Sequence, residues 1–439
     1  MKQMIFVVVL LVNTLNLAAQ DLSQLDQYLS VLEANDKLMA TMTITSQGKE
    51  IYSKGVGYAD INSNNKNSIE TKFRIGSITK AFTAVMIFQL IDEGKITLNS
   101  PLSLFFKEIP NASKITIAHL LNHSSGLYNI TNDPNFDQWM LKSSSRSDML
   151  TRIKVYDLDF IPGEQTAYSN TNYLLLGYII EVLDKNQYSQ SLKERITDKI
   201  DLKDTYVGGK INSSNNESHS YAIVNAKWTK QLETDMSNPG GAGAIVSTSV
   251  DLTKFMNALF SGKLISEDSF EIMKKTNDGE TCHGIFYANL NGLDIYASEG
   301  GIDGFQSMLA HVPKFKTTIA LTANGLDYSK MQIMLSAFGL LSGQSIVMPV
   351  FSKLELTEEQ VKRYEGEYAC EEVPYKLIFE ANGTILMGAP EQSQLMELTP
   401  TKQHQFTFDT LGVVLDFYPG IEAVKFTKGS DKPLIFKKQ

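Results

Sequence analysis

The sequence has few of the residues that define several protein classes. Its 439 residues include two cysteines, Cys282 and Cys370, and six histidines. Two cysteines this far apart do not make a disulfide framework, and neither lies in a pattern that favours a thiol nucleophile. We therefore interpret both as structural residues.

Positive charge is also scarce. The chain has 40 Lys and Arg against 49 Asp and Glu, a formal net charge of −9. A nucleic-acid-binding protein needs a basic surface, so this balance argues against such a partner. Net charge otherwise bears on solubility and indicates no particular substrate.

Long apolar runs are absent. The apolar segment at residues 4–12 is too short to span a bilayer, and no later run reaches the roughly 20 apolar residues of a membrane helix. Lys2 before this segment and Ala18 and Ala19 after it are typical of a secretory signal peptide. We predict a signal peptide at residues 1–19 and a periplasmic or secreted protein. A buried N-terminal strand is the alternative interpretation.

The remaining chain divides into two parts that differ in their predicted secondary structure. Residues 20–345 mix strand-like runs, such as 38–44 and 317–321, with helical segments, which predicts an α/β (α+β) domain. The polar stretches 62–68 and 211–220 predict surface loops.

From Val361 onward, apolar and polar residues alternate, as around Leu377 and Phe379. Asn382-Gly383 predicts a hairpin in which both turn residues have positive φ. Repeated short strands at this spacing predict a small all-β, barrel-like or sandwich domain at residues 356–439.

The first candidate for chemistry is Ser77-Ile78-Thr79-Lys80, at the start of a predicted helix that ends near Gly94. Residues three apart share a helix face, so the Lys80 amine lies within reach of the Ser77 hydroxyl. Unpaired N–H groups of a first helical turn suit a developing oxyanion. Serine is a common N-cap, however, and on this pattern alone a cap with a solvated Lys80 is the better interpretation.

Two further segments favour a catalytic interpretation of Ser77 and Lys80 over the N-cap interpretation. Tyr168-Ser169-Asn170 precedes an apolar helical run, and its phenol and amide could shuttle a proton and bind both lysine and substrate. The alternative is that Asn170 caps the helix above Tyr168. The second segment, residues 298–305, follows a strand predicted at 293–297. Its Gly300 and Gly301 let the backbone approach a ligand closely, although a plain glycine-rich turn is the alternative.

Together these segments resemble the serine β-lactamase and penicillin-binding-protein superfamily, in its class C and esterase-like branch. The resemblance runs from about Phe73 to Val312. It includes residues 73–80, 119–127, 162–163, 168–170, 243–255 and 300–305.

The resemblance implies a helical domain and a helix-covered antiparallel sheet, with the site between them. It also implies acyl transfer, in which Ser77 attacks a carbonyl and Lys80 takes its proton directly or through Tyr168. Asn170 would position Lys80 and the substrate. The backbone N–H groups of Ser77 and Gly301 would hold the oxyanion.

The other residues of the third segment would bind substrate. Gly300 lies beside the oxyanion position, and Ser298 occupies the place where the superfamily usually has Lys or His for a substrate carboxylate. Loss of that positive charge argues against efficient β-lactam and carboxypeptidase activity, but it does not remove the nucleophile. Glu299 repels anionic substrates if it points into the cleft, whereas strand alternation could turn it to the opposite face.

Neither a metal nor a cofactor is implied. His119 and His123 are four residues apart, but the residues between them lack the Glu of a metalloprotease helix. We interpret both histidines as structural. The expected partner is a small-molecule or peptide substrate, and the role of the C-terminal domain and the oligomeric state stay open.

We therefore predict an exported serine hydrolase that forms an acyl-enzyme with ester or amide substrates, D-amino-acid peptides among them. The alternatives are a D-alanyl-D-alanine carboxypeptidase or D-aminopeptidase, a β-lactamase, and a catalytically weak cell-wall or peptide-binding protein of the same fold. Covalent labelling by an active-site serine probe distinguishes an enzyme from such a binding protein.

Overall fold

The computed structural model describes residues 22–290, 292–351, 354–408, 412–428 and 432–439. The predicted signal peptide at residues 1–19 lies outside the described residues. Among the described helices, none is long and apolar enough to cross a membrane.

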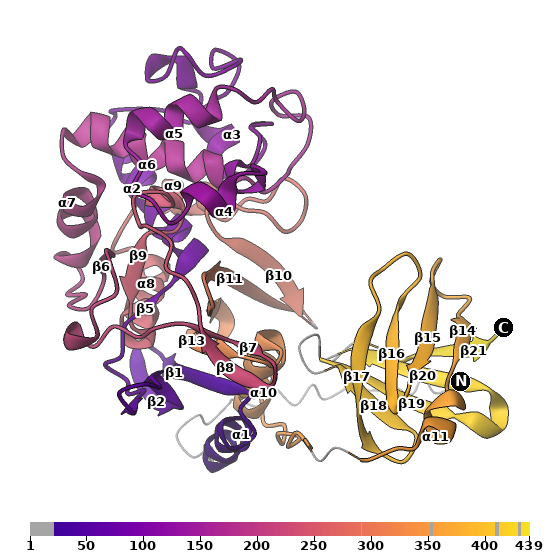
Figure 1. The fold of residues 1–439 in the computed structure, drawn as a ribbon. Helices are drawn as coiled ribbons and strands as arrows, with labels where there is room; N and C mark the ends of the chain where they lie inside the picture. The colour runs from indigo at the N-terminus through magenta and orange to yellow at the C-terminus, as the bar shows by residue number, and fades with distance from the viewer. Residues whose placement is uncertain (1–21, 291, 352–353, 409–411, 429–431) are drawn as a thin grey trace, which may run out of the picture.

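An antiparallel sheet forms the centre of the main body, with a helical region above it (Figure 1). The strand order along the sheet is β10-β11-β12-β13-β1-β2; off this path, β7 pairs with β13 and β8 pairs with β7. The bounds of these strands are β1 Leu38–Ser46, β2 Lys49–Val56, β7 Tyr221–Val224, β8 Lys227–Lys230, β10 Phe286–Leu290, β11 Leu293–Ile302, β12 Phe305–Val312 and β13 Thr317–Leu326.

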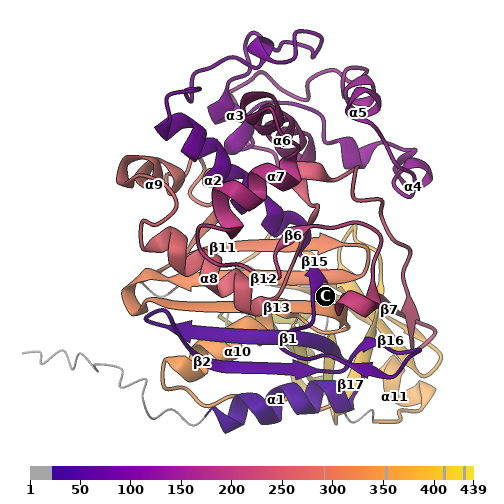
Figure 2. The same cartoon turned by 90° about the vertical axis from the view of Figure 1, so that its left-hand side faces the viewer.

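Helices cover both faces of this sheet, as the face-on view in Figure 2 shows. Helix α8 (Ser249–Phe260) packs on one face, and α1 (Ser23–Ala34) and α10 (Lys330–Leu341) pack on the other. Consequently, all nine residues of β1 are buried. Its apolar residues, including Met42 and Ile44, join the core with α1 and α10.

The opposite face of β1 carries threonines rather than large apolar residues. Thr41 and Thr43 hydrogen-bond with Ser249 of α8 at 3.1 and 2.8 Å, and Thr45 accepts a hydrogen bond from Asn257 at 2.8 Å. The period-two pattern of a strand thus separates an apolar core from a buried polar contact with α8.

The helical region is built around α2 (Thr79–Asp92), which is buried at every position from Thr79 to Leu90. A helix that is apolar all round needs neighbours on every side. The remaining helices are α3 Ile117–Leu121, α4 Phe136–Trp139, α5 Arg146–Ile153, α6 Asn170–Asp184, α7 Tyr188–Leu192 and α9 Glu267–Met273. A small sheet of β5 (Phe73–Arg74), β9 (Ile245–Ser247) and β6 (Tyr206–Val207) leads the chain into α2.

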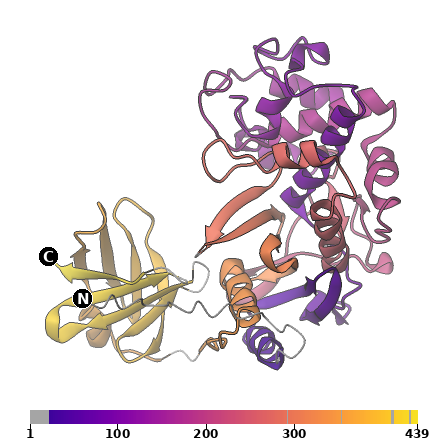
Figure 3. The same cartoon turned by 180° about the vertical axis from the view of Figure 1, so that it is seen from behind.

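The C-terminal strands close into an antiparallel barrel, which stands beside the main body on the side of α10 (Figures 1 and 3). Aromatic side chains, including Tyr364, Phe379, Phe406, Phe417 and Phe436, fill its interior. Its elements are α11 Glu358–Lys362, β14 Gly366–Ala369, β15 Lys376–Asn382, β16 Ile385–Pro390, β17 Met396–Lys402, β18 Gln405–Phe408, β19 Val413–Tyr418, β20 Ala423–Lys428 and β21 Leu434–Lys438.

The predicted fold class is confirmed, with a helical region, a helix-covered antiparallel sheet and a C-terminal all-β barrel.

Three local predictions need correction. First, Asn382 pairs with Ile385, so the hairpin loop is Gly383-Thr384, and of Asn382 and Gly383 only Gly383 has positive φ. The reason is that glycine alone suits the first position of this two-residue turn.

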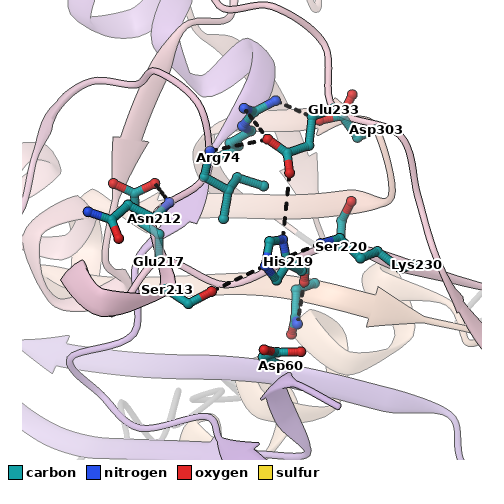
Figure 4. A network of polar contacts seen from close by, with 12 residues as sticks. Asp60, Arg74, Asn212, Ser213, Glu217, His219, Ser220, Lys230, Glu233 and Asp303 are labelled. Atoms are coloured by element: carbon teal, nitrogen blue, oxygen red, sulfur yellow. Dashed lines mark hydrogen bonds and ion pairs between the residues drawn. The ribbon is translucent and has the colours of Figure 1, made fainter. Parts of the chain in front are cut away.

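Second, β11 continues to Ile302, five residues beyond its predicted end at Ala297, because the glycines pair with β12 instead of forming a turn. Third, the stretch 211–220 is not simply a surface loop. Glu217, Ser218 and Ser220 are buried, and Glu217 and Ser220 belong to the polar network shown in Figure 4. Polar composition predicted exposure, but tertiary hydrogen bonds allow these side chains to be buried.

We predict that limited proteolysis cuts the chain near residues 346–356. The described residues between α10 and α11 form neither helix nor strand, which makes backbone in this stretch accessible to a protease. The expected product is a folded β-rich fragment of about 80 to 90 residues, within the usual domain range. Circular dichroism of the isolated fragment provides the check, and an unfolded fragment would show that the barrel depends on the main body.

Candidate active site

Ser77 lies where the start of α2, the loop before α6 and strand β11 meet. It belongs to the short 3₁₀ helix η2 (Gly76–Ile78), and neither η2 nor α2 has a side-chain N-cap bond. The N-cap interpretation of Ser77 therefore does not apply. The preceding Gly76 has φ +52°, and a Cβ on it would lie 2.8 Å from the Gly301 nitrogen. Glycine is needed here both for the backbone angle and for this close approach.

The Lys80 side chain is buried with three polar neighbours. Its Nζ lies 2.9 Å from Ser77 Oγ, 2.8 Å from Asn170 Oδ1 and 2.7 Å from the Ala242 carbonyl oxygen. None of these neighbours is an anion, so burial is the main electrostatic influence on the amine. Burial lowers the pKa of Lys80 well below its usual value, because the protein interior disfavours the charged form.

Tyr168 approaches Ser77 from the other side. Its hydroxyl donates to Ser77 Oγ at 2.7 Å and lies 3.4 Å from Asn170 Oδ1. Burial raises the pKa of the phenol to about 12; the bond to Ser77 opposes this and the charge of Glu299 adds to it. The side chain therefore keeps its proton at neutral pH, even though 42% of the residue is exposed at the cleft.

Asn170 is the first residue of α6, and neighbouring side chains set the orientation of its amide. Its Nδ2 donates to Asn129 Oδ1 and Thr131 Oγ1, both at 3.2 Å. The amide oxygen is thereby turned toward Lys80, where it can only accept. Ser169, rather than Asn170, occupies the N-cap position of α6.

Strand β11 brings Gly300 and Gly301 against the backbone around Ser77. A Cβ on Gly300 would lie 2.0 Å from the Ile75 carbonyl oxygen and 2.9 Å from the Ser77 nitrogen, which no other residue type could accommodate. Ser298 is buried and shares the Gly300 face of the strand, since side chains alternate along it. Together with Lys80, Ser298 lines a narrow recess next to Ser77.

Glu299 lies on the alternate face of β11, where its carboxylate forms an ion pair with Lys330 of α10 at 3.0 Å. Lys330 also donates to Gln306 on β12 at 3.2 Å. Glu299 still affects the site, because its charge contributes to the raised pKa of Tyr168. Strand alternation thus sets the carboxylate toward Lys330, while Glu299 also borders the recess next to Ser77.

His123 contacts the site residue Tyr168, although its sequence context did not indicate a place in the site. Its ring lies beneath Tyr168, with centroids 4.6 Å apart, and its Nδ1 accepts a hydrogen bond from the Ser169 N–H at 3.2 Å. Burial, with a smaller effect from Lys80, lowers the pKa of His123 to about 3, so the ring is neutral. Four-residue spacing from His119 pointed to metal binding or packing, and nothing in it indicated Tyr168.

His119, by contrast, has a local role: its Nδ1 accepts from the Thr116 N–H at the start of α3. Within the described ranges, no group of three or more His, Cys, Asp and Glu side chains could hold a metal ion. Both cysteines are free thiols in the structure.

A pocket of about 400 Å³ opens beside Ser77 on the side of Asn170 and Gly301. Apolar side chains form much of its wall: Ile130, Phe136, Trp139, Met140 and Leu174. The site thus has a roomy apolar side and, at the recess containing Ser298, a narrow side.

The fold, with serine, lysine and tyrosine side chains in contact between the helical region and the sheet, is that of the β-lactamase-fold serine hydrolases. The Beta-lactamase family model matches residues 29–338, and the chain belongs to this family. Residues 77–80 and strand β11, which carries Gly300 and Gly301, both fall inside the matched region.

Similar proteins extend the likeness beyond that region. Penicillin-binding protein 4* of Bacillus subtilis (strain 168) is 25% identical over 418 residues, which cover 88% of this chain and 91% of that protein. A D-stereospecific amidohydrolase from Streptomyces sp. has a TM-score of 0.64 and 26% identity, covering 72% of this chain and 98% of its own. The octameric penicillin-binding protein homologue from Pyrococcus abyssi, at 21% identity, shares the fold over 95% of this chain and 100% of its own, with a TM-score of 0.67.

The lowered pKa of Lys80 predicts a pH-dependent stability. Between that pKa and the unfolded value of about 10.4, the unfolded chain holds one more proton than the folded one. The free energy of unfolding should therefore rise with pH in this window, relative to Lys80→Met, by about 1.4 kcal/mol per pH unit. Denaturant titrations of both proteins from pH 6 to 10 measure this difference. Parallel curves would mean that Lys80 stays protonated in the fold.

Proposed function

We propose that the protein is an exported serine hydrolase that forms an acyl-enzyme with neutral esters or amides carrying an apolar acyl group. One observation carries this proposal: the Ser77 hydroxyl lies 2.9 Å from a buried amine and 2.7 Å from a protonated phenol. The apolar leader at residues 4–12 supports export.

Hydrogen-bond accounting favours Lys80 as the base. The Asn170 amide oxygen and the Ala242 carbonyl oxygen can only accept, so each takes one N–H of Lys80. A neutral amine has two N–H bonds and one lone pair. The lone pair then remains for the third neighbour, Ser77, whose hydroxyl proton it can accept as the oxygen attacks the carbonyl.

Tyr168 is better suited to giving a proton than to taking one. With a pKa of about 12, its phenolate form is rare at neutral pH. A protonated phenol beside the attacking oxygen can donate to the leaving group and recover a proton from Lys80. The neutral ring of His123 packs beneath it and helps hold this position.

The oxyanion is assigned to the backbone N–H groups of Ser77 and Gly301. Both residues border the apolar pocket, and Gly76 and Gly300 allow their backbones to come together. Fixed N–H donors at such a position stabilise charge that develops in the transition state.

The two sides of Ser77 are assigned to different parts of the substrate. We assign the acyl group to the apolar pocket with Phe136 and Trp139, which suits an aromatic or branched side chain. The leaving group is assigned to the side of Ser77 at Tyr168, next to the narrow recess that Ser298 and Glu299 line. A hydroxyl at position 298 gives a leaving-group carboxylate only a neutral hydrogen bond, about half as strong as one from Lys or protonated His.

Other activities of this family compete with the proposal. A carboxypeptidase or β-lactamase acts on substrates with a free carboxylate, and the only Lys or Arg among the described residues lining this recess is Lys80, whose lowered pKa favours the neutral amine. Hydrolysis of D-amino-acid amides is the second candidate, favoured by the likeness to the D-stereospecific amidohydrolase. A binding protein without turnover is disfavoured by the Ser77, Lys80 and Tyr168 contacts, which serve no evident binding purpose.

A fluorophosphonate probe should acylate Ser77, and Ser77→Ala should abolish labelling. Turnover of a p-nitrophenyl ester should fall by several orders of magnitude, since only binding and oxyanion stabilisation would remain. Peptide mass spectrometry locates the adduct. An adduct on another residue, or equal turnover in Ser77→Ala, would rule out this nucleophile, and Ser103→Ala, at a partly exposed position in Leu102–Leu104, serves as a matched control.

Ser298→His should shift preference toward substrates that end in a free carboxylate. A charged hydrogen bond from His would favour the acid over its methyl ester by about 1–2 kcal/mol relative to wild type. The measurement is kcat/KM for matched acid and methyl-ester substrates near pH 6, where a histidine of ordinary pKa is largely protonated. Ser298→Ala is the control, because it removes the hydroxyl without adding charge. A wild type that already prefers the acid would mean that another residue binds the carboxylate.

A further inference from the structure

A buried ion pair links the two backbone segments that carry the proposed oxyanion donors (Figure 4). Arg74 lies three residues before Ser77, and Asp303 lies two residues after Gly301. Arg74 Nη1 donates to Asp303 Oδ2 at 2.9 Å, and the two side chains are 2% and 0% exposed. One contact therefore spans two segments that are 229 residues apart in the sequence.

The Asp303 carboxylate holds the turn that follows Gly301. Its second oxygen accepts from both the backbone N–H and the hydroxyl of Thr234, at 3.0 and 2.7 Å. Asp303 has φ +54°, a conformation that non-glycine residues rarely adopt without support from their surroundings. The next N–H, that of Gly304, donates to Ser220 Oγ at 3.1 Å.

The Arg74 guanidinium is equally well fixed. Its Nη1 also donates to the Thr234 carbonyl oxygen, and Nη2 donates to that of Gly209, both at 2.8 Å. Glu233 lies 3.6 Å from Nη2, and its other oxygen lies 3.7 Å from His219 Nδ1. A planar guanidinium with several fixed acceptors has little freedom to move. It therefore fixes the position of one backbone segment relative to the other.

The segments that the ion pair joins are in direct backbone contact at the site. A Cβ on Gly76 would lie 2.8 Å from the Gly301 nitrogen, and one on Gly300 would lie 2.9 Å from the Ser77 nitrogen. Small relative movements here change the distance between the two N–H groups. Such donors are effective only when they point at the position that the oxyanion will occupy.

We propose that Arg74 and Asp303 are positioning residues that set the spacing of the Ser77 and Gly301 N–H groups. They act through the backbone: Arg74 through β5 and η2, and Asp303 through the end of β11. Asp303 borders the pocket beside Ser77, but its side chain is 0% exposed and binds Arg74 and Thr234. This inference rests on the proposed function, because it assigns the oxyanion to those N–H groups. It predicts that loss of the ion pair weakens transition-state binding more than substrate binding.

The test compares wild type, Asp303→Asn and Arg74→Lys. The readouts are kcat and KM for a p-nitrophenyl ester and Ki for an aryl boronic acid, which forms a tetrahedral anion on the serine. In both variants we expect kcat to fall and Ki to rise by about 10- to 100-fold, below the 10²–10³-fold cost of removing a donor outright. KM should change less than about threefold, since ground-state binding uses the donors weakly.

A second buried ion pair provides the matched control. Arg195 pairs with Asp184 at the end of α6, with side chains 10% and 9% exposed, and neither residue lines the pocket beside Ser77. Asp184→Asn should lower the melting temperature but leave kcat and Ki unchanged. Arg74→Lys keeps the charge, so it provides the kinetic comparison if Asp303→Asn does not fold.

The outcomes separate this inference from the proposed function. If wild type labels at Ser77 and the Arg74 and Asp303 variants lose only thermal stability, the positioning role is wrong and the proposed function stands. Equal losses of kcat in Asp184→Asn would also overturn it, because any buried pair would then suffice. If wild type forms no Ser77 adduct, the proposed function fails and the positioning role fails with it.

Discussion

The burial of one amine is the constraint on which the site depends. Lys80 sits on a helix that is enclosed by its neighbours, and its three hydrogen-bonding neighbours include no carboxylate. Folding therefore favours the neutral form, which costs stability at neutral pH and supplies a base where one is needed. Desolvation also lowers the pKa of His123 and raises that of Tyr168, so three titratable groups near Ser77 are held in uncharged forms. The surrounding packing thus determines their protonation.

The sequence predicted the parts of the molecule that local patterns determine. The strands at Leu38 and Thr317, the helix after Ser77 and the alternating C-terminal strands all follow from periodicity. The candidate site residues came from three separated segments, and the structure brings Ser77, Lys80, Tyr168 and Asn170 within hydrogen-bonding distance. Their catalytic and binding roles, like those of Ser298, Gly300 and Gly301, remain predictions.

Contacts between distant segments could not be read from the sequence. Nothing around Glu299 indicates that Lys330 neutralises it, and nothing around Arg74 indicates Asp303. The extra length of β11 was missed because its glycines suggest a turn, whereas pairing with β12 and contact with the Ser77 backbone keep them in a strand. Likewise, Glu217 and Ser220 look like loop residues, but the network around Arg74 buries them. In each case a tertiary interaction outweighs a local preference.

The order of strands in the sheet has a consequence for how the chain folds. Strand β1 pairs with β13, so Leu38 meets Leu326 only after nearly the whole main body has been synthesised. Each barrel strand, by contrast, pairs with the next one in sequence, apart from the closing pair of β14 and β21. Non-local pairing slows folding because a long loop must close first. The main body should accordingly fold more slowly than the barrel, with its N-terminal strands exposed to misassembly until β13 arrives, while the barrel forms quickly from neighbouring hairpins.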